Sequence, residues 1–574
     1  MSRKSLAFHK DVIEGKRKAY AWGLGGAMQY LLLQAPYRFD GIIDGLAKDD
    51  SKGTVSGIPL YSPDVLSQLD PLETTIVVFA DPIRFFRQIK RQVRRYGEFP
   101  VVMPFVEFRD YPLLSGDKQV RSEARVYWRS RLRHALHDMR GAESIKPVKN
   151  RVALWNYALA KGGAERQLVL LALGLRKLGW EVDFITIGKD QPKTDSWANE
   201  MRLAGVNRFI LPTQRDYLSI VEEDSRERAI ASYLGPYFVL PALHEMVATA
   251  TILWDRKPEL LISYLDYSNI VAAIAAVASG VPKILMSGRN VAPSQFPGLR
   301  GFPIKKHELK GVYRSLLELP GVYLCNNSQS GAESYRRWLG LASDSGKISV
   351  VPNAVSTPVS SVHSDVRKSF NLGATSPLIV GVMRFSEEKC PQGFVDVFER
   401  VLSRHPDAHA ILVGDGALKS QIQKVVAERG LTRQLHFAGM QDLSYPFLRA
   451  ADLLLLTSRM EGMPNVILEA QSVGCPVVAT RVGGVMEAMA PVLHSNVFEF
   501  QDWESMAARC SELLTDPDRR KWEGSQARKY LLENRDSVTL AKQTLAACER
   551  VEAEDIGCHS RRAFDVNACS SPIA

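Results

Sequence analysis

The sequence predicts an α/β protein made of parallel sheets, and two observations lead to this prediction. Strand-like apolar runs alternate with amphipathic, helix-like stretches along almost all of the 574 residues. The alternation restarts twice, after polar stretches that we interpret as linkers. We therefore expect a smaller Rossmann-like domain, followed by two Rossmann-like domains that face each other. The predicted ranges are 1–145, 150–355 and 356–554, with an irregular tail at 555–574.

Strands are expected where short apolar runs end at turn residues, and helices where the apolar residues recur with helical spacing. The predicted strands are 19–22, 39–43 and 75–79 in the first block, 151–155, 181–185, 260–264, 283–287 and 322–326 in the second, and 378–382, 409–413, 434–437, 452–456 and 476–479 in the third. The main predicted helices are 83–96, 165–178 and a final one at 528–551. Open sheets of this kind bind ligands at the carboxyl ends of their strands.

The composition is that of a folded protein in a reducing compartment. Apolar residues make up 45% of the chain and charged residues 24%, which excludes a largely disordered protein. The longest apolar run, Ile270 to Ala278, is too short to cross a membrane, and the first twenty residues contain no signal-peptide stretch. The seven cysteines form no CxxC pair and no metal-ligand spacing. We therefore expect reduced thiols and a cytoplasmic location.

Positive charge gathers near the start of the chain. The net charge is +10, and one cluster comprises Arg84, Arg87, Lys90, Arg91, Arg94 and Arg95. A second basic stretch, 121–140, places Trp128, Leu132, Ala135, Leu136 and Met139 on one helical stripe. A helix packed on its own domain and a peripheral contact with the cytoplasmic membrane face both remain open interpretations. Nucleic acid is disfavoured as a partner, because no recognition motif accompanies the charge.

The first block also contains a glycine turn after its first strand. Gly23 to Gly26 form this turn, and Asp44 follows about twenty residues later, a spacing typical of dinucleotide-binding sites. The third glycine of that pattern is absent, because position 28 is Met. This departure argues against a nicotinamide site.

The most informative stretch runs from Ser458 to Ala470 and contains two glutamates eight positions apart, Glu461 and Glu469. Pro464 suits the first position of a helix, where the missing N–H group would have no partner. Glu461 would then precede this helix and Glu469 would lie inside it. Both carboxylates would face the ligand-binding edge of the sheet, where free N–H groups at a helix start attract phosphate.

This stretch resembles the Glu-x7-Glu signature of the retaining glycosyltransferases of family 4, which have the GT-B fold. Further elements of the same family occur in the same order over roughly residues 150–550. They are Gly162-Gly163-Ala164-Glu165, Ser287-Gly288-Arg289-Asn290, Val351-Pro352-Asn353, Val382-Met383-Arg384 with Lys389, Leu412-Val413-Gly414-Asp415-Gly416 and Gly474-Cys475-Pro476. The first block, with its run from Val55 to Pro63, is similar to small Rossmann-like domains attached to sugar-modifying enzymes of surface-polysaccharide pathways. Such domains bind nucleotide sugars in some cases, and a structural or oligomerisation role is the alternative.

The resemblance implies a role for each matching residue. Arg384 and Lys389 would neutralise the donor diphosphate, which agrees with the strength of charge-assisted contacts where leaving charge develops. Glu469 would hold the donor ribose, and Glu461 the sugar hydroxyls near the reacting carbon. The other positions implied for donor binding are Gly162, Gly163, Gly414, Met463, Pro464, Asn465 and Val466. The alternatives are surface ion pairs with Glu387 and Glu388 for the cations, and capping or solvated side chains for the two glutamates.

The acceptor side is less clear. Arg289, Asp266, Asn269 and His244 are candidates to line it, and a structural role is the alternative for the last three. Cys390 stands where the family often has glycine, which affects the expected loop shape. The Asp516-Pro517-Asp518 stretch is interpreted as a helix cap, so we expect no metal and no cofactor beyond the nucleotide-sugar substrate.

The predicted function is that of a retaining, metal-independent hexosyltransferase. The expected partners are a nucleotide-sugar donor, with a UDP-sugar favoured, and a saccharide or lipid-linked acceptor of cell-surface polysaccharide biosynthesis, as in capsule or exopolysaccharide. One alternative is a non-catalytic scaffold of a polysaccharide assembly complex. Another is a GT-B sugar-nucleotide epimerase or a phosphorylase.

Overall fold

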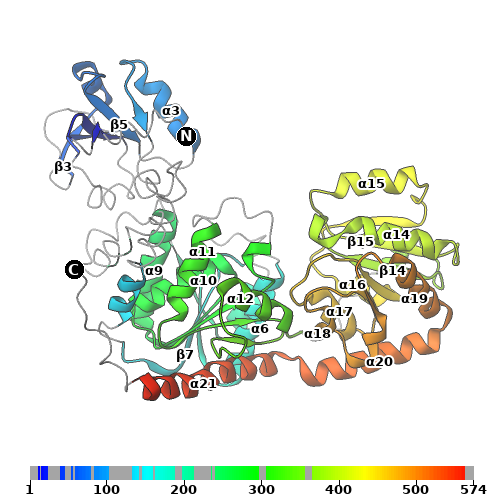
Figure 1. The fold of residues 1–574 in the computed structure, drawn as a ribbon. Helices are drawn as coiled ribbons and strands as arrows, with labels where there is room; N and C mark the ends of the chain where they lie inside the picture. The colour runs from blue at the N-terminus through cyan, green and yellow to red at the C-terminus, as the bar shows by residue number, and fades with distance from the viewer. Residues whose placement is uncertain are drawn as a thin grey trace, which may run out of the picture.

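The structure is a computed structural model with three α/β units along the chain (Figure 1). The residues that it describes are 11–12, 15–22, 39–44, 54–55, 58–78, 83–102, 132–140, 145–159, 162–187, 197–211, 230, 234, 240–295, 306–355 and 365–562. Within these ranges the strands form one sheet in each unit. The predicted α/β class with parallel sheets is confirmed.

The first sheet has the strand order β3-β4-β2-β1-β5-β6 and is parallel except for the β3–β4 pair. Its elements are β1 (Lys18–Trp22), β2 (Gly41–Ile43), β3 (Thr54–Val55), β4 (Ile58–Tyr61), the 3₁₀ helix η1 (Pro63–Gln68), β5 (Thr74–Val78), α3 (Ile83–Val93) and β6 (Val101–Val102). Trp22, Ile43 and Val78 belong to its small apolar core. The glycine turn at 23–26, Met28 and the run at 121–131 lie outside the described residues.

The second sheet, with its helices, is called the N-lobe here. All its strands are parallel, in the order β13-β12-β11-β10-β7-β8-β9. They are β7 (Val148–Trp155), β8 (Glu181–Ile187), β9 (Asn207–Leu211), β10 (Pro258–Tyr264), β11 (Lys283–Gly288), β12 (Val322–Asn326) and β13 (Ile348–Val350). The helices are α6 (Gly163–Lys177), α7 (Ala198–Leu203), α9 (Leu240–Arg256), α10 (Asp266–Ala278), η3 (Pro293–Gln295), α11 (Lys306–Leu317) and α12 (Gln329–Leu339).

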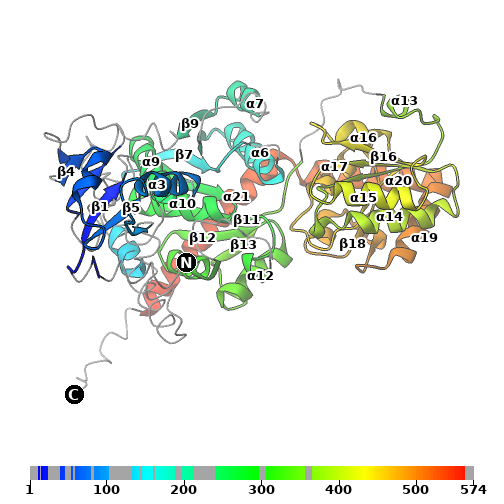
Figure 2. The same ribbon diagram turned by 90° about the horizontal axis from the view of Figure 1, so that it is seen from above.

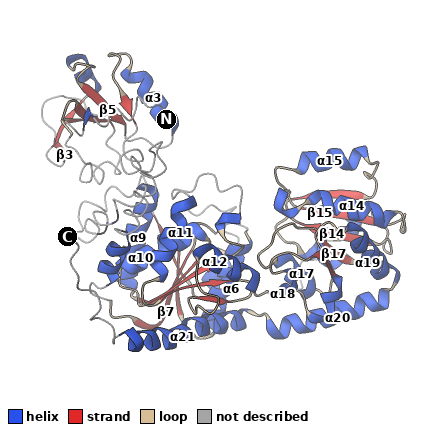
Figure 3. Ribbon diagram, in the orientation of Figure 1, coloured by secondary structure: helices blue, strands red, loops and turns tan. Residues whose placement is uncertain are grey.

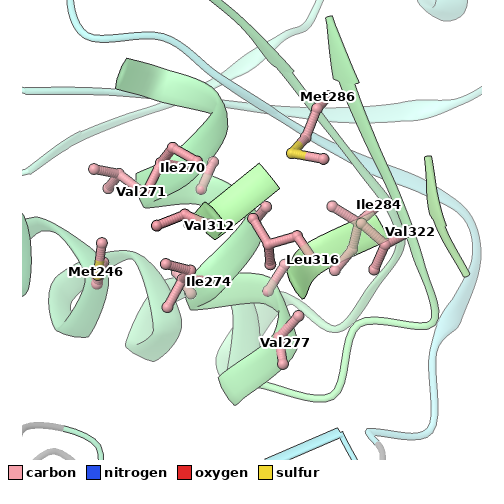
Figure 4. Packing of buried hydrophobic residues seen from close by; sticks show 14 of the residues in the cluster. Met246, Ile270, Val271, Ile274, Val277, Ile284, Met286, Val312, Leu316 and Val322 are labelled. Atoms are coloured by element: carbon pink, nitrogen blue, oxygen red, sulfur yellow. The ribbon is translucent and has the colours of Figure 1, made fainter. Parts of the chain in front are cut away.

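The apolar run at 270–278 is a core helix. Every residue from Ile270 to Val277 in α10 is fully buried. Figure 4 shows Ile270 and Ile274 among Met246 of α9, Met286 of β11 and Leu316 of α11. The helical stripe of the second basic stretch enters the same core, because Leu132, Ala135 and Leu136 are buried and Met139 packs against it. The described part of that stripe, from Leu132 to Met139, is therefore covered by the N-lobe.

The third sheet, with its helices, is called the C-lobe here. Its parallel strands have the order β16-β15-β14-β17-β18-β19. They are β14 (Leu378–Val382), β15 (His409–Val413), β16 (Leu435–Gly439), β17 (Leu453–Leu456), β18 (Val477–Thr480) and β19 (Val497–Phe498). Helices cover both faces of this sheet (Figure 3). They are α13 (Val366–Ser369), η4 (Glu387–Lys389), α14 (Pro391–Leu402), α15 (Lys419–Glu428), α16 (Tyr445–Ala450), α17 (Asn465–Ser472), α18 (Val485–Ala488), η5 (Pro491–Asn496), α19 (Trp503–Thr515) and α20 (Pro517–Asn534).

The chain returns to the N-lobe through its last helix, α21 (Ser537–Arg562), which packs against α6 (Figures 1 and 2). The sequence predicted one helix at 528–551, but two helices meet there. The break has a local cause, because the Asp536 carboxylate accepts the N–H of Thr539 at 2.7 Å and so caps a new helix. Beside the break, the Val355 N–H donates to the Arg535 carbonyl at 2.8 Å, so both crossings between the lobes lie together.

Candidate functional site

Several predicted site residues follow the carboxyl ends of strands in the two lobe sheets. On the N-lobe side, the segment after β7 leads to Gly162 and Gly163, and Arg289 follows β11. On the C-lobe side, Arg384 follows β14 and Gly414 follows β15. The carboxyl ends of parallel strands are where open sheets bind ligands, and both lobes place their motifs there.

Lys389 and Glu461 form an ion pair at this edge of the C-lobe. The Lys389 Nζ lies 2.7 Å from Oε1 and 2.8 Å from Oε2 of the Glu461 carboxylate. Oε1 also accepts the Ser458 hydroxyl at 2.7 Å. The Glu461 side chain is 6% exposed and that of Lys389 27%. Lys389 therefore pairs with the first glutamate of the motif rather than with its neighbours Glu387 and Glu388.

Glu469, the second glutamate of the motif, is held by both lobes. Its Oε1 accepts a hydrogen bond from Arg166 of α6 in the N-lobe, and its Oε2 accepts the hydroxyl of Ser444 beside α16. The side chain is only 10% exposed, and it lies inside α17 as the sequence predicted. Pro464 is the residue before that helix rather than its first member, and Asn465 begins it.

Asn465 joins the two lobes at the start of α17. Its side-chain amide donates to the Gly163 carbonyl at 3.0 Å, and its Oδ1 accepts from Asn353 at 2.7 Å and from Gln167 at 3.0 Å. Asn353 also donates to the Met463 carbonyl at 3.0 Å. A Cβ at position 163 would lie 2.6 Å from the Asn465 nitrogen, so a larger residue there would displace the Asn465 side chain.

Gly414 is required by its backbone conformation. Its φ of +136° lies in a region that L side chains rarely adopt. A Cβ there would lie 1.9 Å from the Met383 carbonyl oxygen. The loop after β15 therefore packs directly on the backbone that leads to Arg384. Arg384 itself is exposed, and its charge acts on Glu165 at the start of α6.

Arg289 is anchored beneath the junction between the lobes. One guanidinium nitrogen donates to the Asn353 side-chain oxygen, and another donates to the Ser287 hydroxyl at 3.3 Å. The guanidinium lies 4.2 Å from the centre of the Tyr264 ring, a cation–π contact. Its contacts are therefore with Asn353, which follows β13, and with Ser287 and Tyr264 of the N-lobe.

Asp266 and Asn269 belong to a buried network at the start of α10. The Asp266 carboxylate accepts the hydroxyls of Tyr313 at 2.8 Å and Tyr335 at 2.6 Å. Burial raises the pKa of Asp266, and the two hydroxyls oppose this rise. Asn269 accepts the Ser263 hydroxyl at 2.9 Å and donates to the Ser287 carbonyl at 3.0 Å. These contacts support the structural interpretation of both residues.

His244 is a member of α9 and is 7% exposed. Burial lowers its pKa to about 4. The adjacent Glu245 accepts the Tyr267 hydroxyl, and burial raises the pKa of Glu245 to about 7 against the opposing effect of that bond. Tyr267 in turn packs edge-on against Tyr157, with ring centres 5.7 Å apart. His244 is therefore packed in the N-lobe. Of these two neighbouring residues, Glu245 has the pKa closer to neutral pH.

Sequence reasoning missed several residues of the site. Arg166 and Ser444 bind the Glu469 carboxylate, and Tyr445 accepts a hydrogen bond from Arg166 at 2.7 Å. Glu165 was noticed only as part of the glycine turn, although burial raises its pKa and Asn156 donates to it. Arg166 directly follows the glycine turn that matches the family. This position next to a motif is the sequence feature that could have indicated a role in the site.

Two further expectations concern metals and membranes. Asp516 caps α20 by accepting the Arg519 N–H at 2.9 Å, which confirms its interpretation as a cap. Among the described residues, no three His, Cys, Asp or Glu side chains lie close enough together to hold a metal ion. None of the helices in the described ranges has the length and apolarity that a membrane crossing requires.

Comparison with known proteins agrees with this arrangement. Residues 363–530 match the family model described as glycosyl transferases group 1. A Salmonella typhi protein named Vi polysaccharide biosynthesis protein VipC/TviE is 30% identical over 368 residues, which are 59% of this chain and 60% of that protein. An Escherichia coli protein named UDP-Gal:alpha-D-GlcNAc-diphosphoundecaprenol alpha-1,3-galactosyltransferase is 25% identical over 253 residues, or 42% of this chain and 62% of that protein.

Among solved structures, Anabaena HepE in complex with UDP-glucose has a TM-score of 0.53 and 18% identity, over 70% of this chain and 99% of that one. This likeness shows the fold, so the GT-B arrangement is confirmed. The predicted resemblance to glycosyltransferases is confirmed as well, and the match to the group 1 model lies within the C-lobe. The chain spans about three fifths of the length of the first relative named above.

From the raised pKa of Glu245 we predict that the stability of the protein depends on pH. Its pKa is about 7 in the folded protein against 4.5 for the exposed group, so the folded state binds its proton more tightly. Stability is therefore lost as pH rises from about 4.5 to about 7, by roughly 3 kcal/mol in full, at 1.4 kcal/mol per pKa unit. Glu245→Gln removes this loss and keeps an acceptor for Tyr267.

We expect Glu245→Gln to stabilise the protein at pH 8 and to have a much smaller effect at pH 5, as measured by urea unfolding. Glu533→Gln, on the exposed face of α20, is the matched control and should change stability little at either pH. An equal effect of Glu245→Gln at both pH values would contradict the assignment.

Proposed function

We propose that this protein is a retaining glycosyltransferase that moves a sugar from a nucleotide-sugar donor, with a UDP-sugar favoured, to a saccharide or lipid-linked acceptor. The observation that carries this proposal is the Lys389–Glu461 ion pair, together with the Glu469 carboxylate inside α17, in a domain that matches the group 1 model. The comparisons support a role in polysaccharide or glycoconjugate biosynthesis, and the solved relative binds UDP-glucose. Cell-surface polysaccharide, such as capsule, is the proposed product.

The donor diphosphate would lie between Arg384 and Lys389. Arg384 is exposed at the end of β14, and the Lys389 ammonium stands over the Glu461 carboxylate with three N–H donors in all. The Nζ lies within hydrogen-bonding distance of both carboxylate oxygens. Fixed cations of this kind stabilise a leaving diphosphate because the charge develops next to them. This arrangement supports transfer without a metal.

Glu461 would bind the donor sugar, and Glu469 the ribose. A carboxylate accepts two hydroxyl donors, which is what neighbouring hydroxyls on a sugar ring present. Glu461 already accepts the Ser458 hydroxyl and the Lys389 ammonium, so its orientation is fixed before the donor arrives. The proposed transfer proceeds on the face of the sugar that the phosphate leaves, with the leaving phosphate oxygen taking the proton of the acceptor hydroxyl.

The test of this function is a transfer assay with defined products. UDP-sugars should raise the melting temperature of the purified protein by mass action, and one of them should act as donor to a lipid-linked or saccharide acceptor. Nuclear magnetic resonance of the product should show the donor's anomeric configuration. Glu469→Ala should lower kcat/KM by about ten- to a thousandfold, the loss expected for one or two charge-assisted hydrogen bonds.

Inverted configuration in the product would refute the retaining mechanism. A folded protein that binds no nucleotide sugar would favour the scaffold role instead.

Metal independence is a separate prediction. Transfer should persist in EDTA, because Arg384 and Lys389 supply the positive charge that a metal would otherwise provide. Lys389→Ala should lower kcat by on the order of a hundredfold or more. Lys419→Ala is the matched control. The Lys419 Nζ lies 2.7 Å from the Asp415 carboxylate in the loop after β15, and loss of this lysine should leave kcat nearly unchanged. Loss of transfer in EDTA, with recovery on adding Mg²⁺, would overturn this prediction.

A peripheral contact with the cytoplasmic face of the membrane is proposed for the first unit. Lys90, Arg91, Arg94 and Arg95 are all exposed at the end of α3 and just beyond it. Anionic lipids attract such a cluster by about 1 kcal/mol per charge near the surface. Contact there would bring the protein to a lipid-linked acceptor.

Vesicle binding tests this contact. The protein should cosediment with vesicles of phosphatidylglycerol at low salt and detach as salt rises, because exposed charges are screened within about 8 Å at physiological ionic strength. Reversing the four charges to glutamate should abolish cosedimentation and leave transfer to a water-soluble acceptor unchanged. Equal cosedimentation of the variant and the unmodified protein would exclude this surface.

A further inference from the structure

Arg166 stands out among the residues of the site that no motif assigns. It belongs to α6 of the N-lobe, and its partner Glu469 belongs to α17 of the C-lobe. Its side chain is 15% exposed and that of Glu469 10%. A charged pair buried to this extent is costly unless its geometry and its other hydrogen bonds are good. The other contacts of Arg166 therefore show how the cost of burying this ion pair is offset.

The guanidinium of Arg166 is fixed on three sides. One nitrogen donates to Glu469, and a second donates to the Tyr445 hydroxyl at 2.7 Å. The group also lies over the Tyr445 ring at 5.2 Å and near the Trp197 ring at 5.8 Å, both within cation–π range. Trp197 comes from the N-lobe and Tyr445 from the C-lobe, so this position of Arg166 exists only while the lobes are in contact.

The Glu469 carboxylate keeps acceptor capacity in this arrangement. A carboxylate offers about four lone-pair sites, two on each oxygen. Arg166 uses one on Oε1 and Ser444 uses one on Oε2, so each oxygen retains one. A pair of neighbouring hydroxyls, such as the 2′ and 3′ hydroxyls of a ribose, supplies one donor for each. Two protein donors thus fix the plane of the carboxylate and leave its remaining sites for a diol.

We propose that Arg166 is a positioning residue of the ribose subsite, which it completes from the opposite lobe by fixing the Glu469 carboxylate. The proposal rests on the proposed function, since the ribose is that of the nucleotide-sugar donor. It adds that discrimination between ribonucleotides and deoxyribonucleotides depends on contact between the lobes. Without Arg166, the carboxylate loses one of its two fixed partners, so its hydrogen bonds to the ribose hydroxyls, including the 2′ hydroxyl, weaken.

The experiment compares UDP with 2′-deoxy-UDP, and GDP with 2′-deoxy-GDP, by titration calorimetry. The full-length protein should bind one ribonucleotide about ten- to a hundredfold more tightly than its deoxy form, as expected for one hydrogen bond to a charged group. Arg166→Ala should reduce this ratio to about threefold or less. Arg166→Lys, which keeps the charge but not the planar fork, should retain an intermediate ratio.

The matched control is Lys177→Ala, at the other end of α6, which should leave the ratio unchanged. Circular dichroism of each variant establishes that it is folded. If Arg166→Ala does not fold, Tyr445→Phe serves in its place, because it removes only the hydroxyl that Arg166 binds and should lower the ratio severalfold.

The outcomes separate this proposal from the proposed function. A folded Arg166→Ala protein with an unchanged ratio would overturn the positioning role and leave the function intact. Tighter binding of the ribonucleotide by Arg166→Ala would also overturn it, by showing that Arg166 competes with the ribose. Absence of any nucleotide binding by the unmodified protein would reject the proposed function, and this proposal with it.

Discussion

The junction at Asn465 is the contact on which the rest of the site depends. The Asn465 side-chain nitrogen donates to the Gly163 carbonyl of the N-lobe. Its side-chain oxygen accepts hydrogen bonds from Asn353 and Gln167. The Gln167 amide in turn binds the backbone of Ala354, where the chain leaves the N-lobe. The start of α17, the glycine turn and the connection between the lobes therefore share one set of hydrogen bonds. A displacement of any of these three segments would be transmitted to the other two.

This junction determines which charges meet. It brings α6 against α17, so that Arg166 reaches Glu469, while Lys389 reaches Glu461 within the C-lobe. Two carboxylates without nearby cations would repel any anionic ligand. Each of them has a cation within hydrogen-bonding distance instead, which offsets the cost of burying the charge. The glutamates can thus act as hydrogen-bond acceptors for sugar hydroxyls without excluding a diphosphate nearby.

Most of the fold could be predicted because buried parallel strands have continuous apolar sequences. The strands at 322–326, 378–382 and 409–413 begin and end where the sequence indicated. The missed strands are short or lie near an edge, as with β13 of three residues and β9 with its polar start, so they lack such a run. The break between α20 and α21 was missed because apolar residues continue with helical spacing on both sides of Asp536.

The site could be predicted only where residues lie next to one another in a motif. Glu461, Glu469 and Lys389 were found in this way, whereas Arg166 and Tyr445 were not. Arg166 is separated from Glu469 by 303 positions, and an arginine near the start of a helix usually faces solvent. Its burial arises from the contact between the lobes, which the local sequence does not encode.

The end of β10 is stabilised in a different way from the surroundings of Glu461 and Glu469. Leu265 has a φ of +76°, which is strained for a residue with a branched side chain. Its N–H donates to the Ser287 carbonyl at 3.1 Å, and its carbonyl accepts the Asn269 N–H at 2.8 Å. The next residue, Asp266, is held by two tyrosine hydroxyls. These bonds over-determine the backbone at the end of β10, so the polar residues that suggested a reactive acceptor site hold a strained turn rigid. Ion pairs therefore dominate around Glu461 and Glu469, and a fixed backbone dominates at the end of β10.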